Sequence, residues 1–253
     1  MRIIRPTYNR WNGLKGIEYF KDAKYILPES QKDKYLKVLG SKQMIVIPDE
    51  CDGSIAKKRN WMLENIKRPY ISIDDDVEYM LMMEGRSKEK RKFVSYKKIE
   101  SKLIHSIFEH YTNLADQLNA KMWGVMQRNT GDQREYREHR PFTLINAVLG
   151  PFHCHLDHDL KYDEDMLNKE DYDMVIQMFS VYKMILRVDK LAIKGEQQGN
   201  EGGIVGERTL EIELKGARNI MNKWGSRIIK YNLNPQKMND VVSGKLNIPI
   251  NGV

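Results

Sequence analysis

The chain has 253 residues, of which 41% are hydrophobic and 30% are charged, and its formal net charge is +7. This composition is typical of one sizeable globular domain and excludes a disordered or fibrous chain. No apolar run approaches the ~20 residues that cross a bilayer, and two cysteines are too few for a disulfide framework. We therefore expect a cytoplasmic protein without a membrane segment, and the positive charge weakly favours a polyanionic or nucleotide partner.

The first third of the chain alternates between predicted strands and helices. Strands are predicted at residues 2–6, 23–27, 44–47 and 70–73. Helices are predicted at residues 30–39, which begin with the capping-box pattern Ser30-x-x-Asp33, and at residues 54–66, where Ser54 can cap the helix. Such alternation specifies a mostly parallel sheet covered by helices, an α/β fold. Ligands bind to such sheets beyond the carboxyl ends of the strands.

The remainder of the chain continues the α/β pattern. A polar excursion is predicted at residues 85–98, an amphipathic helix at 101–118, and strands at 122–127, 142–149, 152–156 and 184–193. Glu170 or Asp171 begins a helix that runs through Phe179, a second helix spans residues 208–224, and a last strand spans residues 227–231. We predict a single domain over residues 1–253, with a nucleotide-binding half at 1–80 and an acceptor-binding half at 120–231.

Three consecutive carboxylates, Asp74, Asp75 and Asp76, follow the predicted strand at residues 70–73. They repel one another at neutral pH, and a hard divalent cation with oxygen ligands would compensate them. Along a strand end, Asp74 and Asp76 would point to one side and Asp75 to the other, which predicts an Asp-x-Asp metal site. The alternative is an ordinary acidic turn after a strand.

Further polar side chains follow other predicted strands at the same edge of the sheet. Thr7, Tyr8, Asn9 and Arg10 come directly after the first strand, and Asp49 comes after the third. Because ligands bind at this edge, we expect these side chains to converge with the three aspartates. This convergence does not depend on any single motif.

Several polar segments have two interpretations each. His153 and His155 would share a strand face and chelate zinc, but no second Cys or His cluster has matching spacing, so we expect surface or acceptor-site histidines. The basic segments at residues 86–98 and 128–140 would grip a phosphate backbone, although charge runs are more often solvated faces. The glycine-rich segment at residues 195–206 is either a loop that closes over a substrate or an ordinary surface loop.

These motifs, in this order, resemble the GT-A class of nucleotide-sugar glycosyltransferases from about residue 3 to residue 179. The resemblance is carried by Pro6-Thr7-Tyr8-Asn9-Arg10, Arg59-Asn60, Asp74-Asp75-Asp76 and Glu170-Asp171. The second half is similar to a narrower group, the TET-associated glycosyltransferases of bacteriophages, in Gly202-Gly203, Arg208-Thr209 and Lys223-Trp224-Gly225. The resemblance implies a single GT-A, Rossmann-like domain with a mixed, mostly parallel sheet flanked by helices.

The resemblance also implies a role for each candidate residue. Asp76, with Asp74, would hold Mn²⁺ or Mg²⁺, which neutralises the leaving diphosphate, and His155 or His158 would add a further ligand. The nucleotide sugar would be bound by Pro6, Thr7, Tyr8, Asn9, Arg10, Asp49, Arg59, Asp74, Asp75, Gly203 and Arg208. For Arg59, a salt bridge that only balances the acidic strand end is an equally good interpretation.

Asp171 is the expected general base, and it would accept the proton of the acceptor hydroxyl in an inverting transfer. Asp165 and Asp173 compete for this role, and an acid that only stabilises a helix N-terminus is the alternative for Asp171.

The resemblance implies transfer of a sugar from a nucleoside diphosphate sugar, expected to be UDP-glucose, to 5-hydroxymethylcytosine in phage DNA within the infected host cytoplasm. Three alternatives remain open at this point. One is the same enzyme acting on a glycan or small-molecule acceptor. The second is a DNA-binding module that retains the fold without catalysis, and the third is a nucleotidyltransferase, which shares the Asp-x-Asp chemistry.

Overall fold

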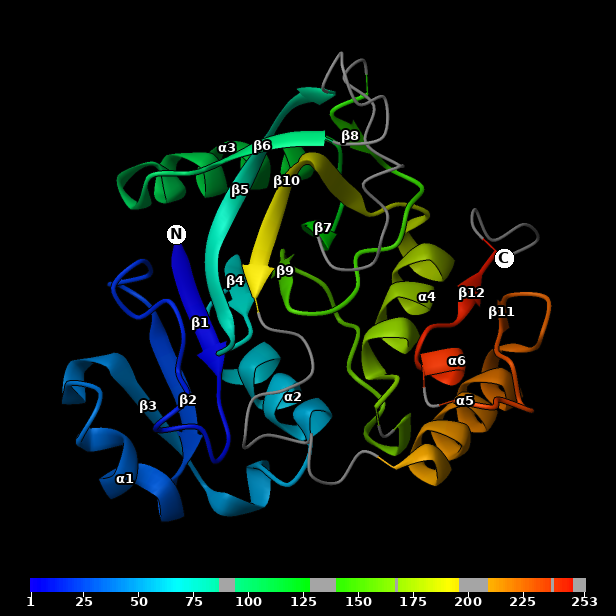
Figure 1. Cartoon of the computed structure of the whole chain (residues 1–253), viewed down its shortest axis with the longest axis horizontal. Coiled ribbons are helices and arrows are strands. Elements are labelled where there is room, and N and C mark those ends of the chain that lie inside the picture. Colours follow the sequence, from blue (N-terminus) through cyan, green and yellow to red (C-terminus); the bar gives the residue numbers. More distant parts are fainter. Residues whose placement is uncertain (87–93, 128–139, 167, 196–208, 238, 248–253) are drawn as a thin grey trace.

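The computed structural model describes residues 1–86, 94–127, 140–166, 168–195, 209–237 and 239–247. Its main feature is a ten-stranded sheet in the order β3-β2-β1-β4-β9-β7-β10-β5-β6, with β8 paired to β10 (Figure 1). The sheet strands are β1 (Arg2–Pro6), β2 (Lys24–Pro28), β3 (Met44–Ile47), β4 (Tyr70–Ile73), β5 (Val77–Arg86), β6 (Val94–Lys98), β7 (Met122–Gln127), β8 (Phe142–Thr143), β9 (Phe152–His155) and β10 (Leu186–Gly195). The α-helices are α1 (Lys32–Leu36), α2 (Ile55–Asn65), α3 (Ile104–Gln117), α4 (Glu170–Tyr182), α5 (Leu210–Trp224) and α6 (Asn239–Val242).

The direction of each strand follows from its pairing. β1 is parallel to β2 and β4, and β2 is parallel to β3. β9 is antiparallel to both neighbours, β4 and β7, so β7 and its parallel partner β10 point the same way as β1. β5 and β8 are antiparallel to β10, and β6 is antiparallel to β5. Only β5, β8 and β9 of these ten strands therefore oppose the common direction, which confirms the predicted α/β fold with a mixed, mostly parallel sheet.

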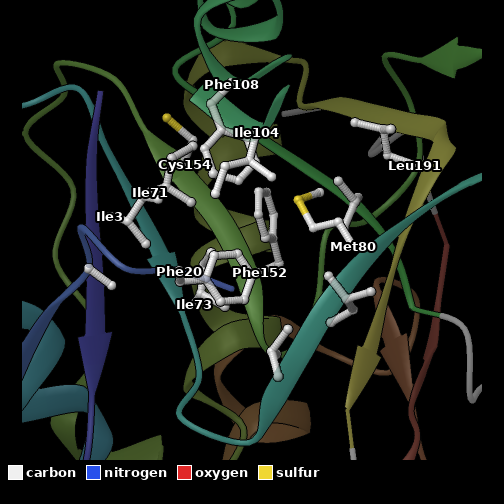
Figure 2. Close-up of a cluster of buried hydrophobic side chains, with 14 of the residues drawn as sticks. Ile3, Phe20, Ile71, Ile73, Met80, Ile104, Phe108, Phe152, Cys154 and Leu191 are labelled. Carbon is white, nitrogen blue, oxygen red and sulfur yellow. The ribbon is translucent and has the colours of Figure 1, made fainter. Parts of the chain in front are cut away.

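Helices cover both faces of the sheet because neighbouring residues of the central strands point to opposite sides. On one face, Ile3 and Ile71 pack in a core with Phe108 of α3, and Figure 2 shows part of this cluster. On the other face, Ile4 packs in a second core that includes Met178 of α4 and residues of α2. This packing leaves the carboxyl ends of β1, β3 and β4 at one edge of the sheet, as predicted.

A small C-terminal unit packs against α4. It contains α5, α6 and the antiparallel pair β11 (Ile229–Lys230) and β12 (Lys245–Leu246), which lie beside α4 in Figure 1. Ile220 of α5 and Ile176 of α4 belong to the same buried cluster. The helix α4 is therefore held between the sheet and this unit. No helix in the described part of the chain is long and apolar enough to cross a membrane.

Two predicted segments differ from the structure. The strand expected at residues 142–149 is limited to Phe142–Thr143, because only these residues pair with β10. The polar excursion expected at residues 85–98 is in its described parts the end of β5 and all of β6, two paired antiparallel strands at the edge of the sheet. Lysines on a sheet edge are favourable because they oppose pairing with other chains, which explains why this strand looks like a polar loop in the sequence.

The predicted capping box before α1 is absent. The helix begins after Gln31, which makes no capping hydrogen bond with its side chain. The Ser30 hydroxyl instead donates to Asp49 Oδ1 at 2.9 Å. Ser54, in contrast, caps α2 as predicted, since its Oγ accepts the Lys57 amide at 3.1 Å.

Candidate functional site

The three aspartates form a turn between β4 and β5. The strand β4 ends at Ile73, and the Val77 amide donates to the Asp74 carbonyl across the turn at 3.3 Å. The expected alternation of side chains along a strand is therefore wrong for these residues, because the strand stops before them. Asp74 faces Arg59 of α2, whereas Asp75 and Asp76 share Arg10.

Asp75 is bound by the loop that follows β1. Its Oδ2 accepts the Thr7 hydroxyl at 2.6 Å, and its Oδ1 lies 2.5 Å from Nη1 of Arg10, which is also 3.4 Å from Asp76 Oδ2. Tyr35 closes the network, since its hydroxyl is 2.6 Å from Thr7 Oγ1 and accepts the Arg10 amide at 3.0 Å. The buried Asp75 thus orders the loop, and Asp74 and Asp76 are the aspartates with more exposed carboxylates.

The other predicted nucleotide-binding residues lie at the same edge of the sheet. Pro6 is buried at the end of β1, and Tyr8 is exposed, with Lys58 Nζ 5.6 Å from its ring centroid. Asn9 has a φ of +53°, and its amide donates to a buried glutamine side chain, Gln31, at 2.9 Å. Asp49 follows β3 and accepts hydrogen bonds from Ser30. These contacts order the loops, and they leave the ring of Tyr8 facing outward.

Arg5 is an important residue that the sequence analysis missed. Its guanidinium is fully buried and donates to the carbonyls of Asp74 and Val77, at 2.8 and 2.9 Å, and to the carbonyl of Lys15 at 2.6 Å. It therefore holds both ends of the aspartate turn by their backbone. An arginine within an apolar strand pattern was the only available signal, because nothing in the sequence indicates which carbonyls it binds.

Arg59 connects the aspartate turn to the start of α4. This buried side chain lies 2.8 Å from Glu170 Oε1 and 3.5 Å from Asp74 Oδ1. Arg59 was expected either to bind the nucleotide sugar or only to balance the acidic strand end. Its pair with Asp74 agrees with both interpretations, because Asp74 is itself a predicted site residue. Burial raises the pKa of Glu170 to about 7 although Arg59 opposes this shift.

Two residues of a single turn join Asp74 to Asp171. The Pro151 carbonyl accepts the Asp74 amide at 2.9 Å, and the Gly150 amide donates to Asp171 Oδ2 at 3.0 Å. The other oxygen of Asp171 accepts the amide of Tyr172 at 2.7 Å. The predicted base and the predicted metal ligand, almost a hundred positions apart in the sequence, thus meet at one dipeptide.

The two competing aspartates have different surroundings. Asp173 is fully buried and accepts hydrogen bonds at 2.6 Å from Gln177 Nε2, one turn further along α4, and from Trp224 Nε1, so it anchors α4 to α5. Asp165 is exposed in a short helical turn before α4. Asp171 is the member of this group that contacts the Gly150–Pro151 turn.

The carboxylates of the turn have shifted acidities. Burial raises the pKa of Asp76 to about 7, and the negative charge of Asp74 adds to the effect. Burial likewise raises the pKa of Asp74, against the attraction of Arg59. The site therefore penalises negative charge, and a bound cation would relieve this penalty. Among the described residues, no group of three or more His, Cys, Asp or Glu side chains is arranged to hold a metal ion.

The three histidines are buried and do not lie at the surface. His153 and His155 are buried because their strand, β9, is flanked by β4 and β7, and His158, beyond the end of β9, is buried as well. Both ring nitrogens of His155 have partners, His158 Nε2 at 2.8 Å and the Tyr162 hydroxyl at 2.9 Å. The expectation of surface histidines is wrong, and a metal-ligand role for His155 has no support in this geometry.

Replacing His158 by glutamine should remove one source of acid sensitivity. Burial, with Arg68 nearby, lowers the pKa of His158 from 6.5 to about 4, so protonation between these values favours the unfolded chain. The stabilisation is complete above the unfolded pKa and is lost as the pH falls to about 4, a change of about 3 kcal/mol. Glutamine keeps a side-chain hydrogen-bond donor but does not take up a proton in this pH range.

The measurement is the free energy of urea unfolding of the wild type minus that of H158Q, followed from neutral to acid pH. The difference is needed because Asp76 and Glu170, with raised pKa values, act in the opposite direction. We expect the wild type to lose stability relative to the variant as the pH falls. A difference that does not change with pH would contradict this assignment.

Several predicted residues lie outside the part of the chain that the structure describes. Gly203 and Arg208, which were expected to bind the nucleotide sugar, are among them. So are most of the glycine-rich segment at residues 195–206 and most of the two basic segments at residues 86–98 and 128–140.

The sheet order and the carboxylates at its carboxyl edge define an α/β protein with a GT-A-like fold. The family model of the TET-associated glycosyltransferases matches residues 7–203, and the chain belongs to this family. This match confirms the resemblance identified from the motifs, and it makes the protein a glycosyltransferase, with a sugar donor and an acceptor as its substrates. No curated protein and no solved structure matches the chain.

Proposed function

We propose that the protein is a metal-dependent glycosyltransferase that moves a sugar from a nucleoside diphosphate sugar to 5-hydroxymethylcytosine in DNA. The observation that carries the proposal is the contact of Asp74 and Asp171 with the same dipeptide, Gly150–Pro151. It ties the backbone of Asp74, suited to the diphosphate side, and the carboxylate of Asp171, suited to the acceptor side, to one turn. The donor is expected to be UDP-glucose, and the setting is the cytoplasm of a phage-infected cell.

The donor set fits Mn²⁺ or Mg²⁺. Asp74 and Asp76 offer carboxylate oxygens on side chains that are 33% and 20% exposed, and both have raised pKa values. A hard cation prefers such oxygen ligands, and Mg²⁺ typically takes one or two carboxylates and completes its shell with phosphate oxygens and water. When bound here, the metal would neutralise charge on the leaving diphosphate.

The residues of the chain divide the remaining work. The loop of Thr7, Tyr8, Asn9 and Arg10 would bind the nucleoside, with Asp49 beside it. Tyr8 offers an exposed ring for the base, whereas Arg10 and Thr7 keep the loop attached to Asp75. These contacts order the loop before substrate arrives, which lowers the entropic cost of binding.

Asp171 would act as the general base. The acceptor hydroxyl gives its proton to the Asp171 carboxylate as its oxygen forms a bond to the anomeric carbon. The bond from that carbon to the diphosphate breaks at the same time, and the diphosphate leaves with the electron pair. Attack on the face opposite the leaving group predicts inversion of the anomeric configuration. A target base inside a duplex would first have to flip out of the stack.

The test incubates the protein with Mn²⁺, a panel of uridine and guanosine diphosphate sugars, and DNA with or without hydroxymethylcytosine. The readout is the mass of the digested nucleosides, with D171N as the matched variant. We expect a hexose-sized gain on hydroxymethylcytosine alone, absent in D171N. Metal-dependent release of the diphosphate without any gain on DNA would reject the DNA acceptor and favour a glycan or small molecule. DNA binding without turnover would reject catalysis.

A further inference from the structure

A continuous row of hydrogen-bonded side chains runs through the core beneath the site. His158 contacts His155 at 2.8 Å, His155 contacts the Tyr162 hydroxyl at 2.9 Å, and that hydroxyl contacts His153 Nε2 at 3.2 Å. All four side chains are buried, at 5% exposure or less. Such polar groups are costly in a core unless each is satisfied, so the complete row indicates a specific arrangement.

The direction of every hydrogen bond in this row follows from one backbone amide. The Leu160 amide can only donate, so His158 Nδ1 accepts, at 3.1 Å, and the proton of neutral His158 is on Nε2. That proton goes to His155 Nδ1, which places the proton of His155 on Nε2, facing the Tyr162 hydroxyl. The hydroxyl must then donate to His153 Nε2.

The row ends at the carbonyl of Gly150. The remaining proton of neutral His153 is on Nδ1, and the backbone of Gly150 is its partner. All three histidines are neutral near pH 7, because burial lowers their pKa values. The row therefore has a single allowed orientation of its protons, from Leu160 to Gly150.

Gly150 is the residue whose amide holds Asp171. Its φ of +77° lies in the region that glycine adopts readily and that other residues avoid. Because glycine can adopt many other backbone conformations, hydrogen bonds are needed to hold this one. The Gly150 carbonyl accepts a hydrogen bond from His153, and the Gly150 amide donates one to Asp171. The next carbonyl, that of Pro151, accepts a hydrogen bond from the Asp74 amide. The orientation of this turn thus sets where the Asp171 carboxylate lies relative to Asp74.

We propose that His153 is a positioning residue for the Asp171 carboxylate, acting through the backbone of Gly150, whose carbonyl it binds and whose amide binds Asp171, and that Tyr162 and His155 fix the ring tautomer on which this depends. The proposal rests on the proposed function, because the role of Asp171 as base comes from it. The residue Asn60 supports the row from α2, since its side chain donates to the Tyr162 carbonyl and accepts the Tyr162 amide, at 2.9 and 2.8 Å.

The test compares H153N with H153L. The Nδ2 group of asparagine takes the place of imidazole Nδ1, so H153N keeps a donor for Gly150, whereas H153L has none. We expect H153L to lose kcat for sugar transfer on the order of 10²-fold, because a misplaced base loses alignment. Its KM for the donor should change little. H153N should recover most of this loss, and Y162F, which keeps the ring but removes the hydroxyl, should fall between them.

A second measurement is independent of turnover. The amide proton shift of Gly150 in NMR spectra reports its hydrogen bond to Asp171, and D171N defines the shift without a carboxylate partner. We expect H153L to move this signal toward the D171N value and H153N to leave it near the wild type. If the wild type transfers no sugar but the signals behave this way, the proposed function fails and the positioning role stands. Equal kcat values and equal Gly150 shifts for H153N and H153L would overturn the positioning role.

Discussion

Replacing Asp76 by asparagine should lower kcat for sugar transfer on the order of 10³-fold, with the fold retained. Asparagine preserves the shape of the side chain but removes the charge that would hold Mn²⁺ or Mg²⁺. In the metal-free protein the same change should be stabilising, because burial and the charges of Asp74 and Asp75 disfavour the ionised Asp76 carboxylate and raise its pKa. Loss of activity together with a gain in stability is the signature of a residue kept for function.

The measurements are steady-state kinetics over a Mn²⁺ titration, Mn²⁺ binding followed by electron paramagnetic resonance, and denaturant unfolding without metal. The control is D116N, which removes an exposed carboxylate near the end of α3. D116N should leave all three quantities near the wild type. If D76N transferred sugar at the normal rate, or bound Mn²⁺ as tightly as the wild type, the proposed metal site would be wrong.

Replacing Arg59 by methionine should lower the free energy of unfolding by about 3–5 kcal/mol. Arg59 is buried, and its loss leaves Glu170 without its cation and removes the cation nearest to Asp74. Because burial has already raised the pKa of Glu170 to about 7, the carboxyl group will be protonated at neutral pH in the variant. The cost comes from the loss of the buried pair: Glu170 must take up a proton in the folded variant, and Asp74 loses the guanidinium that faces it.

The matched control is K161M, which breaks an ion pair of similar length on the surface, where Lys161 Nζ lies 2.5 Å from Glu64 Oε1. Both of its side chains are more than half exposed, so solvent screens the pair and its removal should be nearly neutral. Adding E170M to R59M should restore part of the stability, since it removes the buried carboxyl group that has lost its partner. Equal losses for R59M and K161M would contradict the importance of burial.

The parts of the site that follow strand ends were predictable from the sequence. The pattern of strands placed Thr7, Arg10 and Asp74 at one edge of the sheet, and a helix beginning at Glu170 brought Asp171 close. Local pattern was sufficient because the carboxyl ends of parallel strands meet at one edge whatever the details of packing.

Contacts that depend on long-range packing were not predictable. Arg5 looks like a polar residue in a strand, and only the tertiary fold shows that it binds the carbonyls of Asp74 and Val77. The histidines were misassigned to the surface because burial depends on which strands flank β9, and strand order is not encoded in local spacing. The predicted strand has the bounds of β4, but the alternation of side chains was extended past Ile73 into the three aspartates, which form a turn where a period of two does not hold.

The sheet also limits how the enzyme can move. The strand β4, which leads to the aspartate turn, is hydrogen-bonded to β9, and β9 to β7, so the first and second halves of the chain share one unbroken ladder. A hinge rotation between the halves would have to break this ladder, at the cost of many backbone hydrogen bonds. Closure around a substrate must therefore come from segments outside the sheet, and the contacts of Asp74 and Asp171 with Gly150–Pro151 do not depend on such a movement.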